Sequence, residues 1–245
     1  MSRILLQSRN LRRTFDTMTA VEDFSMTLEA GQLVGLLGPN GAGKTTTLRM
    51  LCGLMEPSSG SVVFDGLSLA ENTVEAKRML GYVADQPMIL PLLTGWEYVQ
   101  FVGGLYGMAP DVIEHNAMPL LERFNLSKAI HRRADSYSHG MQQKLALVAQ
   151  IVHEPLVLLA DEPTVGLDPA SAAQMEEVFR EFCQAGHAIL ISTHLLSMAQ
   201  ELCDKVLIMT KGNIVAEGSP ATLVQEAGDS LQNLFLRLTQ EEASP

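Results

Sequence analysis

Three short runs of the chain are almost entirely apolar, at positions 33–37, 156–160 and 188–192. Five-residue apolar runs with polar or turn residues at their ends are typical of strands buried on both faces of a parallel sheet. Longer segments, in which apolar residues recur at helical spacing, separate these runs. The pattern therefore predicts an α/β fold with a mostly parallel sheet.

The same pattern predicts further elements along the chain. Strands are expected at 4–6, 10–15, 20–28, 61–64, 81–84, 205–210 and 213–217. Helices are expected at 46–52, 74–80, 95–106, 112–124, 141–153, 170–184 and 195–202, with an amphipathic helix and an acidic tail from residue 221.

Two regions differ from the parallel core. The earliest strands come before the first buried run, which predicts a small N-terminal antiparallel β subdomain. The segment 87–155 is mostly helical, which predicts an inserted helical subdomain. We expect residues 1–245 to form a single domain, with an α/β core at 1–86 and 156–220, the helical subdomain at 87–155, and a C-terminal helix and tail at 221–245.

A glycine-rich loop joins the strand at 33–37 to the next helix. It reads Gly38, Pro39, Asn40, Gly41, Ala42, Gly43, Lys44, Thr45 and Thr46. Two glycines five apart, followed by lysine and a hydroxyl residue, form the P-loop phosphate-binding pattern, and chance gives it in roughly 1% of chains of this length. Glycines let backbone N–H groups turn towards a phosphate, and the helix start adds unpaired N–H groups. We therefore predict a P-loop NTPase core in which Lys44 meets the terminal phosphates and the Thr45 hydroxyl meets Mg²⁺.

Acidic residues follow the second apolar run directly. Asp161 and Glu162 stand at the carboxyl end of this strand, where α/β sheets bind their ligands. One carboxylate can hold Mg²⁺ opposite Thr45, and the next can orient the attacking water. A solvated acidic turn is the alternative, but the phosphate loop favours the functional interpretation. His194 follows the third run in the same way and is a candidate for contact with the γ-phosphate.

Three other positions have both a local and a functional interpretation. Phe15, at the end of an early strand, can stack on an adenine ring or pack in the core. Ser138 precedes a long helix, whose N–H groups either bind an anion or are simply capped by the serine. Asp168 before Pro169 forms an ordinary helix start, a role compatible with a functional one.

Composition narrows the classes of protein. The net charge of -11 argues against a nucleic-acid-binding surface. The three cysteines are widely spaced without a CxxC pair, as expected for reduced thiols in a cytosolic protein. No apolar run reaches the length of a membrane span, and the first residues lack the apolar core of a signal peptide. We expect a soluble protein whose role at a membrane, if any, comes through a partner.

Together these residues resemble the nucleotide-binding subunit of ATP-binding-cassette (ABC) transporters. The resemblance runs from Phe15 to about Gly218. Residues 38–45 look like the Walker A loop and residues 156–161 like Walker B. Other motifs match in order: Ser138 to Met141 lie at the signature loop, Glu162 at the catalytic glutamate, Asp168 at the D-loop, His194 at the switch histidine, and Phe15 at the adenine-stacking residue.

The resemblance is sharper to the exporter-type (ABC-2-like) branch. That branch often carries stretches similar to Gly-Tyr-Val-Ala-Asp at 81–85 and Tyr-Ser-His-Gly-Met at 137–141. The signature differs from the usual family sequence but keeps Ser138 and Gly140. The Q-loop glutamine is replaced by Asp85, and Gln86 comes one residue later. Either can reach Mg²⁺ or the attacking water, and the register favours Asp85.

The family implies a head-to-tail dimer, of two copies or with a related ATPase subunit, that encloses two ATP molecules with Mg²⁺. Each ATP lies on the Walker A loop of one subunit and is covered by Ser138 of the other. Hydrolysis powers an integral membrane permease, so the subunit is expected on the cytoplasmic face of the membrane. A non-transport ABC ATPase, linked to cell division, assembly, nucleic acid or ribosomes, is the alternative. No nucleic-acid partner is expected.

Overall fold

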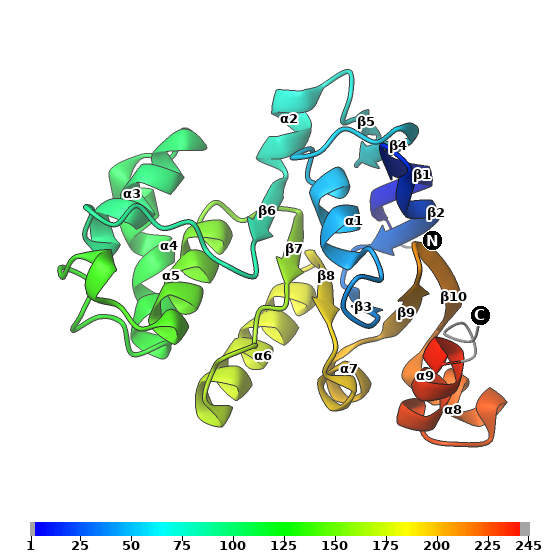
Figure 1. Ribbon diagram of the computed structural model, residues 1–245. Helices are drawn as coiled ribbons and strands as arrows, with labels where there is room; N and C mark the ends of the chain where they lie inside the picture. Colours follow the sequence, from blue (N-terminus) through cyan, green and yellow to red (C-terminus); the bar gives the residue numbers. More distant parts are fainter. Residues whose placement is uncertain (1–2, 241–245) are drawn as a thin grey trace.

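The computed structural model describes residues 3–240 (Figure 1). The strands are β1 (Ile4–Phe15), β2 (Met18–Glu29), β3 (Leu33–Leu37), β4 (Ser59–Phe64), β5 (Leu67–Ser68), β6 (Leu80–Val83), β7 (Val157–Asp161), β8 (Ala188–Thr193), β9 (Lys205–Thr210) and β10 (Asn213–Gly218). The helices are α1 (Lys44–Leu51), α2 (Thr73–Arg78), α3 (Gly95–Leu105), α4 (Pro110–Arg123), α5 (His139–Ile151), α6 (Pro169–Gln184), α7 (Leu196–Leu202), α8 (Pro220–Ala227) and α9 (Leu231–Gln240), with a 3-10 turn at Ala134–Ser136.

Within the described residues, all ten strands belong to one curled sheet in the order β5-β4-β1-β2-β10-β9-β3-β8-β7-β6. The first four of these pair antiparallel, and β9, β3, β8, β7 and β6 run parallel. Strand β10 pairs antiparallel with β9 and joins β2 through a parallel bridge between Asn213 and Asp23. The predicted α/β class, with its antiparallel N-terminal strands beside a parallel core, is confirmed.

The central strands β3, β7 and β8 are buried along their whole length, because helices or strands cover both faces of the sheet. Helix α1 packs against β1, β2 and β7, whereas α6 packs against β3 and β8. Side chains of alternate residues along each strand therefore enter two separate hydrophobic cores. This packing holds the carboxyl ends of the parallel strands in place beneath the glycine-rich loop.

Helices α3, α4 and α5 form a separate group next to the edge strand β6 (Figure 1). Thr94 and Glu97 form a reciprocal capping box at the start of α3, which fixes where that helix begins. The interior of the group is apolar and continuous with the core beneath β7 and β8. The helical character predicted for 87–155 is thus present.

One backbone oxygen, that of Leu80 in β6, receives side chains from two of these helices. The Tyr106 hydroxyl at the end of α3 donates to it at 3.1 Å. His153, just after α5, places Nε2 3.3 Å from the same oxygen and stacks its ring on Tyr106 at 3.5 Å between centroids. Burial lowers the pKa of His153 from 6.5 to about 4. The neutral imidazole is therefore the form that joins the helices to the sheet.

Replacing His153 with Phe should make folding stability less sensitive to acid. Between pH 6.5 and about 4 the unfolded chain binds a proton at His153 that the folded protein does not, so the free energy of unfolding falls as the pH drops. Phe keeps a ring on Tyr106 and cannot be protonated. On going from pH 7 to pH 5, wild type should lose about 2 kcal/mol more than the variant in urea denaturation. Equal losses would contradict this.

The structure corrects several predicted boundaries. The two strands predicted at 4–6 and 10–15 are one continuous strand, β1. Within it, Asn10 adopts a left-handed φ of 47°, and the pairing with β2 shifts register there. The irregularity interrupts the alternation of inward- and outward-facing side chains along the strand. For this reason the polar stretch at 7–10 resembles a loop between two separate strands. The helix predicted at 74–80 ends at Arg78, and Leu80 already begins β6.

The structure also differs from the prediction at β5 and in the C-terminal helices. The two-residue strand β5 was not predicted, because it is too short to carry a pattern. The helix predicted from residue 221 is two helices, α8 and α9, since Gly228 takes a left-handed conformation between them. The predicted acidic tail at 241–245 lies outside the described residues. None of the helices within 3–240 combines the length and apolar character that crossing a bilayer requires.

Candidate active site

The glycine-rich loop connects the end of β3 to the start of α1. Gly43 has φ 107°, and a Cβ there would lie 2.5 Å from the Ala20 carbonyl oxygen. A Cβ on Gly38 would lie 2.4 Å from the Met209 carbonyl oxygen, so neither position accommodates a side chain. Among the described residues no side chain caps α1. An uncapped helix start leaves its first N–H groups without side-chain partners, which suits it to binding an anion.

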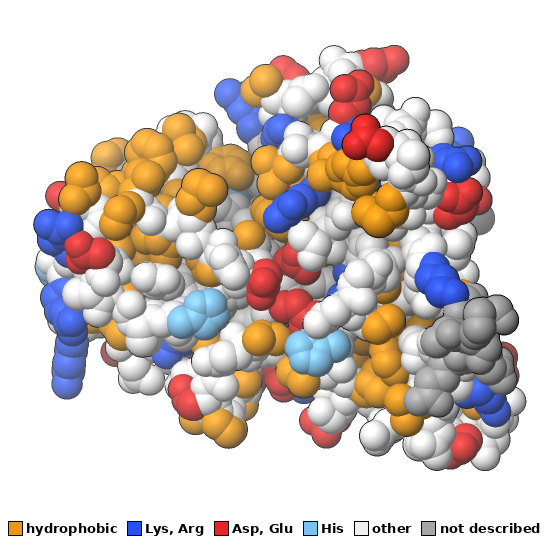
Figure 2. Space-filling model, viewed as in Figure 1, with side chains coloured by type: hydrophobic (Ala, Val, Ile, Leu, Met, Phe, Trp, Pro, Cys, Tyr) orange, Lys and Arg blue, Asp and Glu red, His pale blue; other side chains and the backbone are white. Residues whose placement is uncertain are grey.

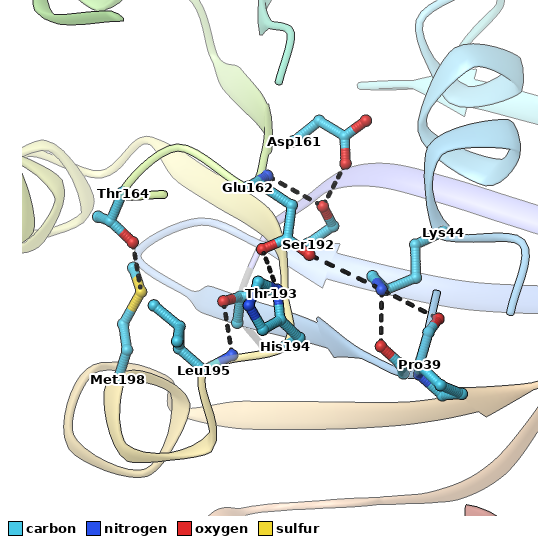
Figure 3. Close-up of polar contacts among 11 residues, drawn as sticks. Pro39, Lys44, Asp161, Glu162, Thr164, Ser192, Thr193, His194, Leu195 and Met198 are labelled. Atoms are coloured by element: carbon cyan, nitrogen blue, oxygen red, sulfur yellow. Dashed lines mark hydrogen bonds and ion pairs between the residues drawn. The ribbon is translucent and has the colours of Figure 1, made fainter. Parts of the chain in front are cut away.

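Lys44 lies beneath this loop with only 7% of its surface exposed. Its ammonium donates to the carbonyl oxygens of Gly38 at 2.6 Å and Pro39 at 3.3 Å, and lies 3.7 Å from Glu162 Oε1 (Figure 3). Burial lowers the pKa of Lys44, and the carboxylates of Glu162 and Asp161 oppose that shift. A partly desolvated cation therefore lies at the glycine-rich loop, where its charge is available to an anion.

Two adjacent acidic residues lie at the end of β7, and Ser192 of β8 contacts the side chain of the first and the backbone of the second. The Ser192 hydroxyl donates to Asp161 Oδ1 and accepts from the Glu162 N–H at 3.1 Å (Figure 3). The Ser192 carbonyl also accepts from the Glu162 N–H at 3.1 Å. Glu162 adopts a left-handed φ of 48°, an uncommon conformation that these contacts hold in place. The chain thus turns sharply, and the two carboxylates point in different directions.

The Glu162 carboxylate joins the phosphate loop to the end of β8. Its Oε1 faces Lys44, and its Oε2 accepts from Nδ1 of His194 at 3.0 Å. The Glu162 side chain is 14% exposed, whereas His194 is 51% exposed. A carboxylate that is partly exposed and hydrogen-bonded to an imidazole is suited to orienting a water molecule next to a phosphate.

The surroundings of the Asp161 carboxylate suit it to binding a divalent cation. The residue is 1% exposed, and its Oδ2 is buried with no hydrogen-bond partner among the described residues. A buried carboxylate oxygen without a donor is costly, and Mg²⁺ bound through one or two protein oxygens, phosphates and water relieves that cost. No cluster of three His, Cys, Asp or Glu side chains within 3–240 could hold a metal by itself. A cation here would depend on nucleotide phosphates for its remaining ligands.

A cavity of about 350 Å³ extends from this loop to the hairpin between β1 and β2. At its far end it is lined by Phe15, Met18 and Ala20, and Asp85 and Glu162 also line it. Gln86 lines a different cavity, of about 340 Å³, next to Arg49 and Tyr82. Of the two alternatives for the Q-loop position, Asp85 is the one that borders the phosphate loop.

Ser138, Gly140 and Asp168 do not line this cavity. Ser138 caps α5 by accepting from the Met141 N–H at 3.3 Å. Both carboxylate oxygens of Asp168 accept from Ser171 at the start of α6, which lowers the pKa of Asp168. The two helix starts are neighbours, since a Cβ on Gly140 would lie 3.2 Å from the Leu167 side chain. These residues form a second, separate surface.

Three residues of the site were not predicted. Ser192 is not among the residues that line the cavity, but its hydroxyl contacts the Asp161 carboxylate and the Glu162 N–H. The signal for it is a single polar residue that ends the apolar run at 188–192. Met18 and Ala20 carry no chemical signal, because an apolar residue after a turn is equally compatible with core packing. Met18 pairs with Phe15 across the hairpin, which brings both to the cavity.

A parallel sheet in which one strand leads into a phosphate loop, and the next strand but one ends in a buried aspartate, defines the class of P-loop nucleoside triphosphatases. The sequence model of the ABC transporter family matches residues 21–165, more than half of the chain. This protein belongs to the ABC transporter family and is an ATP-binding ATPase subunit of that class.

Individual relatives agree with this assignment. The chain is 33% identical to the ABC-type transporter ATP-binding protein EcsA of Bacillus subtilis (strain 168), over 98% of both chains. It is 36% identical to the Nod factor export ATP-binding protein I of Burkholderia lata, over 89% of this chain and 71% of that protein. A solved structure of an ATP-binding subunit of an ABC transporter superposes with a TM-score of 0.90 at 32% identity, covering 96% of this chain and 99% of that one.

Proposed function

We propose that this protein hydrolyses ATP to drive an exporter, from the cytoplasmic face of the membrane and bound to a permease subunit. The observation that carries the ATPase step is the position of Glu162, between Lys44 and His194 at the mouth of the phosphate loop. The names of relatives such as the Nod factor export protein support export as the direction.

The site residues take the following roles in this proposal. Backbone N–H groups of residues 38–46 and the Lys44 ammonium hold the phosphates, and Phe15 stacks on the base. Thr45, Asp161 and Asp85 hold Mg²⁺, which when bound neutralises phosphate charge. Glu162 accepts a proton from the attacking water, and His194 fixes that carboxylate and contacts the γ-phosphate. Gln86, which lines the neighbouring cavity, is assigned to the permease side instead.

The separate surface formed by Ser138, Gly140 and Asp168 supports a shared site between two subunits. Ser138 and Asp168 are exposed at two adjacent helix starts, outside the cavity of their own chain. A single phosphate loop surrounds only part of a triphosphate, so a second anion-binding corner from a partner can cover the γ-phosphate. In the proposed head-to-tail dimer, ATP joins the two surfaces and hydrolysis separates them.

An exposed apolar surface near the loop that follows Asp85 supports binding of a protein partner. Figure 2 shows hydrophobic side chains gathered over α3 and continuing towards β6. The most exposed of them are Met88 at 89%, Leu92 at 74% and Leu105 at 69%. An exposed apolar patch of this kind indicates a binding surface. We assign it to the permease, because the loop that carries Met88 and Leu92 begins directly after Asp85.

Charging this patch should separate the subunit from its membrane partner. A Met88→Glu, Leu92→Glu variant is expected to lose co-purification from membranes with a permease subunit, while its own ATP binding is unchanged. Leu236→Glu, at a similarly apolar but distant position on α9, is the matched control and should keep the complex. A complex that survives both changes places the interface elsewhere. Wild-type protein that never associates with membranes favours the non-transport ATPase.

A further inference from the structure

One face of the Phe15 ring is covered by the charged side chain of Arg13. The guanidinium carbon of Arg13 lies 4.6 Å from the centre of the Phe15 ring. Phe15 itself lines the cavity that contains the phosphate loop. An aromatic ring with a guanidinium on one face and a cavity beside it is a stacking platform supported from behind.

Arg13 is fixed in this position. Its Nη1 donates to the Glu56 carbonyl oxygen at 2.8 Å, and its Nε is buried with no acceptor among the described residues. The Glu56 segment follows α1 and is itself held to β1, since Ser58 accepts from the Thr14 N–H at 3.2 Å and donates its own N–H to the Arg12 carbonyl. The arginine therefore joins the strand that carries Phe15 to the loop behind the phosphate-binding helix.

Among the residues that the structure describes, the two that line the cavity together with Phe15 at the hairpin between β1 and β2 are Met18 and Ala20, and both are apolar. A nucleobase bound here is held by stacking and dispersion, so the orientation and electrostatics of one ring determine how well it binds. A cation behind that ring offsets the negative potential of its π-face and so favours an electron-rich base on the opposite face.

We propose that Arg13 is a positioning residue for the nucleobase, acting through Phe15 and not through the phosphates. The inference rests on the proposed nucleotide-binding role of this cavity. Arg13 holds the ring of Phe15 in one orientation before the base arrives, so less conformational freedom is lost on binding. Its contribution belongs to affinity for the base and leaves the chemical step unchanged.

Arg13→Met tests this, because Met keeps an unbranched apolar stem and removes the guanidinium. The dissociation constants for ATP and for inorganic tripolyphosphate, which has no base, are measured by calorimetry on the full chain. The variant should raise the Kd and KM for ATP roughly three- to tenfold, with kcat within about twofold of wild type and the tripolyphosphate Kd unchanged. Arg13→Lys should recover part of the ATP affinity.

Two controls separate this role from a structural one. Arg12→Met removes the neighbouring arginine, which pairs with Glu22 at 3.1 Å, and should change neither ligand's affinity. In a Phe15→Leu background, Arg13→Met should have no further effect on ATP binding, because the ring through which it acts is gone.

Three results would overturn the inference: equal weakening of ATP and tripolyphosphate, an unchanged ATP affinity, or an undiminished effect in the Phe15→Leu background. Wild-type protein that binds tripolyphosphate but not ATP would contradict the base site itself. Wild-type protein that binds neither would contradict the proposed function.

Discussion

Glu162→Gln is expected to abolish most ATP turnover while leaving ATP binding intact. The amide has nearly the shape of the carboxylate, so the contacts that hold the turn after β7, through the Glu162 N–H and Ser192, are kept. It cannot accept a proton from water, and general bases of this kind contribute about 10²- to 10⁴-fold. We therefore expect kcat to fall at least about a hundredfold.

The same substitution should make an ATP-dependent dimer visible. Removing the carboxylate also removes a negative charge that faces Lys44 at 3.7 Å, near where the γ-phosphate would lie. ATP that is bound but not hydrolysed then keeps two subunits together, and size-exclusion chromatography with and without ATP measures this. Glu226→Gln, an exposed position on α8, is the matched control. Wild-type turnover in Glu162→Gln would remove Glu162 from the mechanism.

Mixing two inactive variants is expected to restore activity. Lys44→Met disables the phosphate loop of the subunit that carries it, and Ser138→Arg blocks the covering surface offered to the other subunit. Each variant alone should be inactive at both sites of its dimer. In a mixed dimer, the intact loop of one subunit meets the intact Ser138 of the other, so one complete site forms.

An equal mixture should reach about a quarter of wild-type turnover, because half of the dimers are mixed and each has one working site. ATPase activity of mixtures at several ratios measures this. Lys44→Met mixed with wild type calibrates how well a single site works by itself. Full activity of either variant alone, or no recovery at any ratio, would contradict the shared site.

The parts of this fold that sequence could predict are those set by local pattern. The run at 33–37 and the glycine spacing after it lie within a few residues of one another, so their geometry follows from a strand, a turn and a helix start. The carboxylates at 161–162 likewise follow directly after the apolar run at 156–160. The placement of Asp161 and Glu162 near Lys44 needed only the rule that parallel strands end at the same edge.

Other features depend on contacts that no local pattern encodes. Asp85 and Gln86 are adjacent, and which of them borders the phosphate loop depends on how the chain leaves β6. The function of Ser192 depends on its pairing with β7, 31 residues away along the chain from Asp161. The single strand β1 was read as two because an irregular pairing hides the alternation on which strand prediction relies.

The shared acceptor on Leu80 gives the molecule a mechanical property. Tyr106 and His153 join the ends of two helices to a single atom of β6, and the Tyr82 N–H of the same strand donates to Gln150 of α5 at 3.0 Å, so the helical group is coupled to β6 at more than one point. Asp85 is five residues further along the same segment, at most about 17 Å away. In the proposed function, a displacement of Asp85 by bound nucleotide would therefore be transmitted along β6 to the helices that present Ser138.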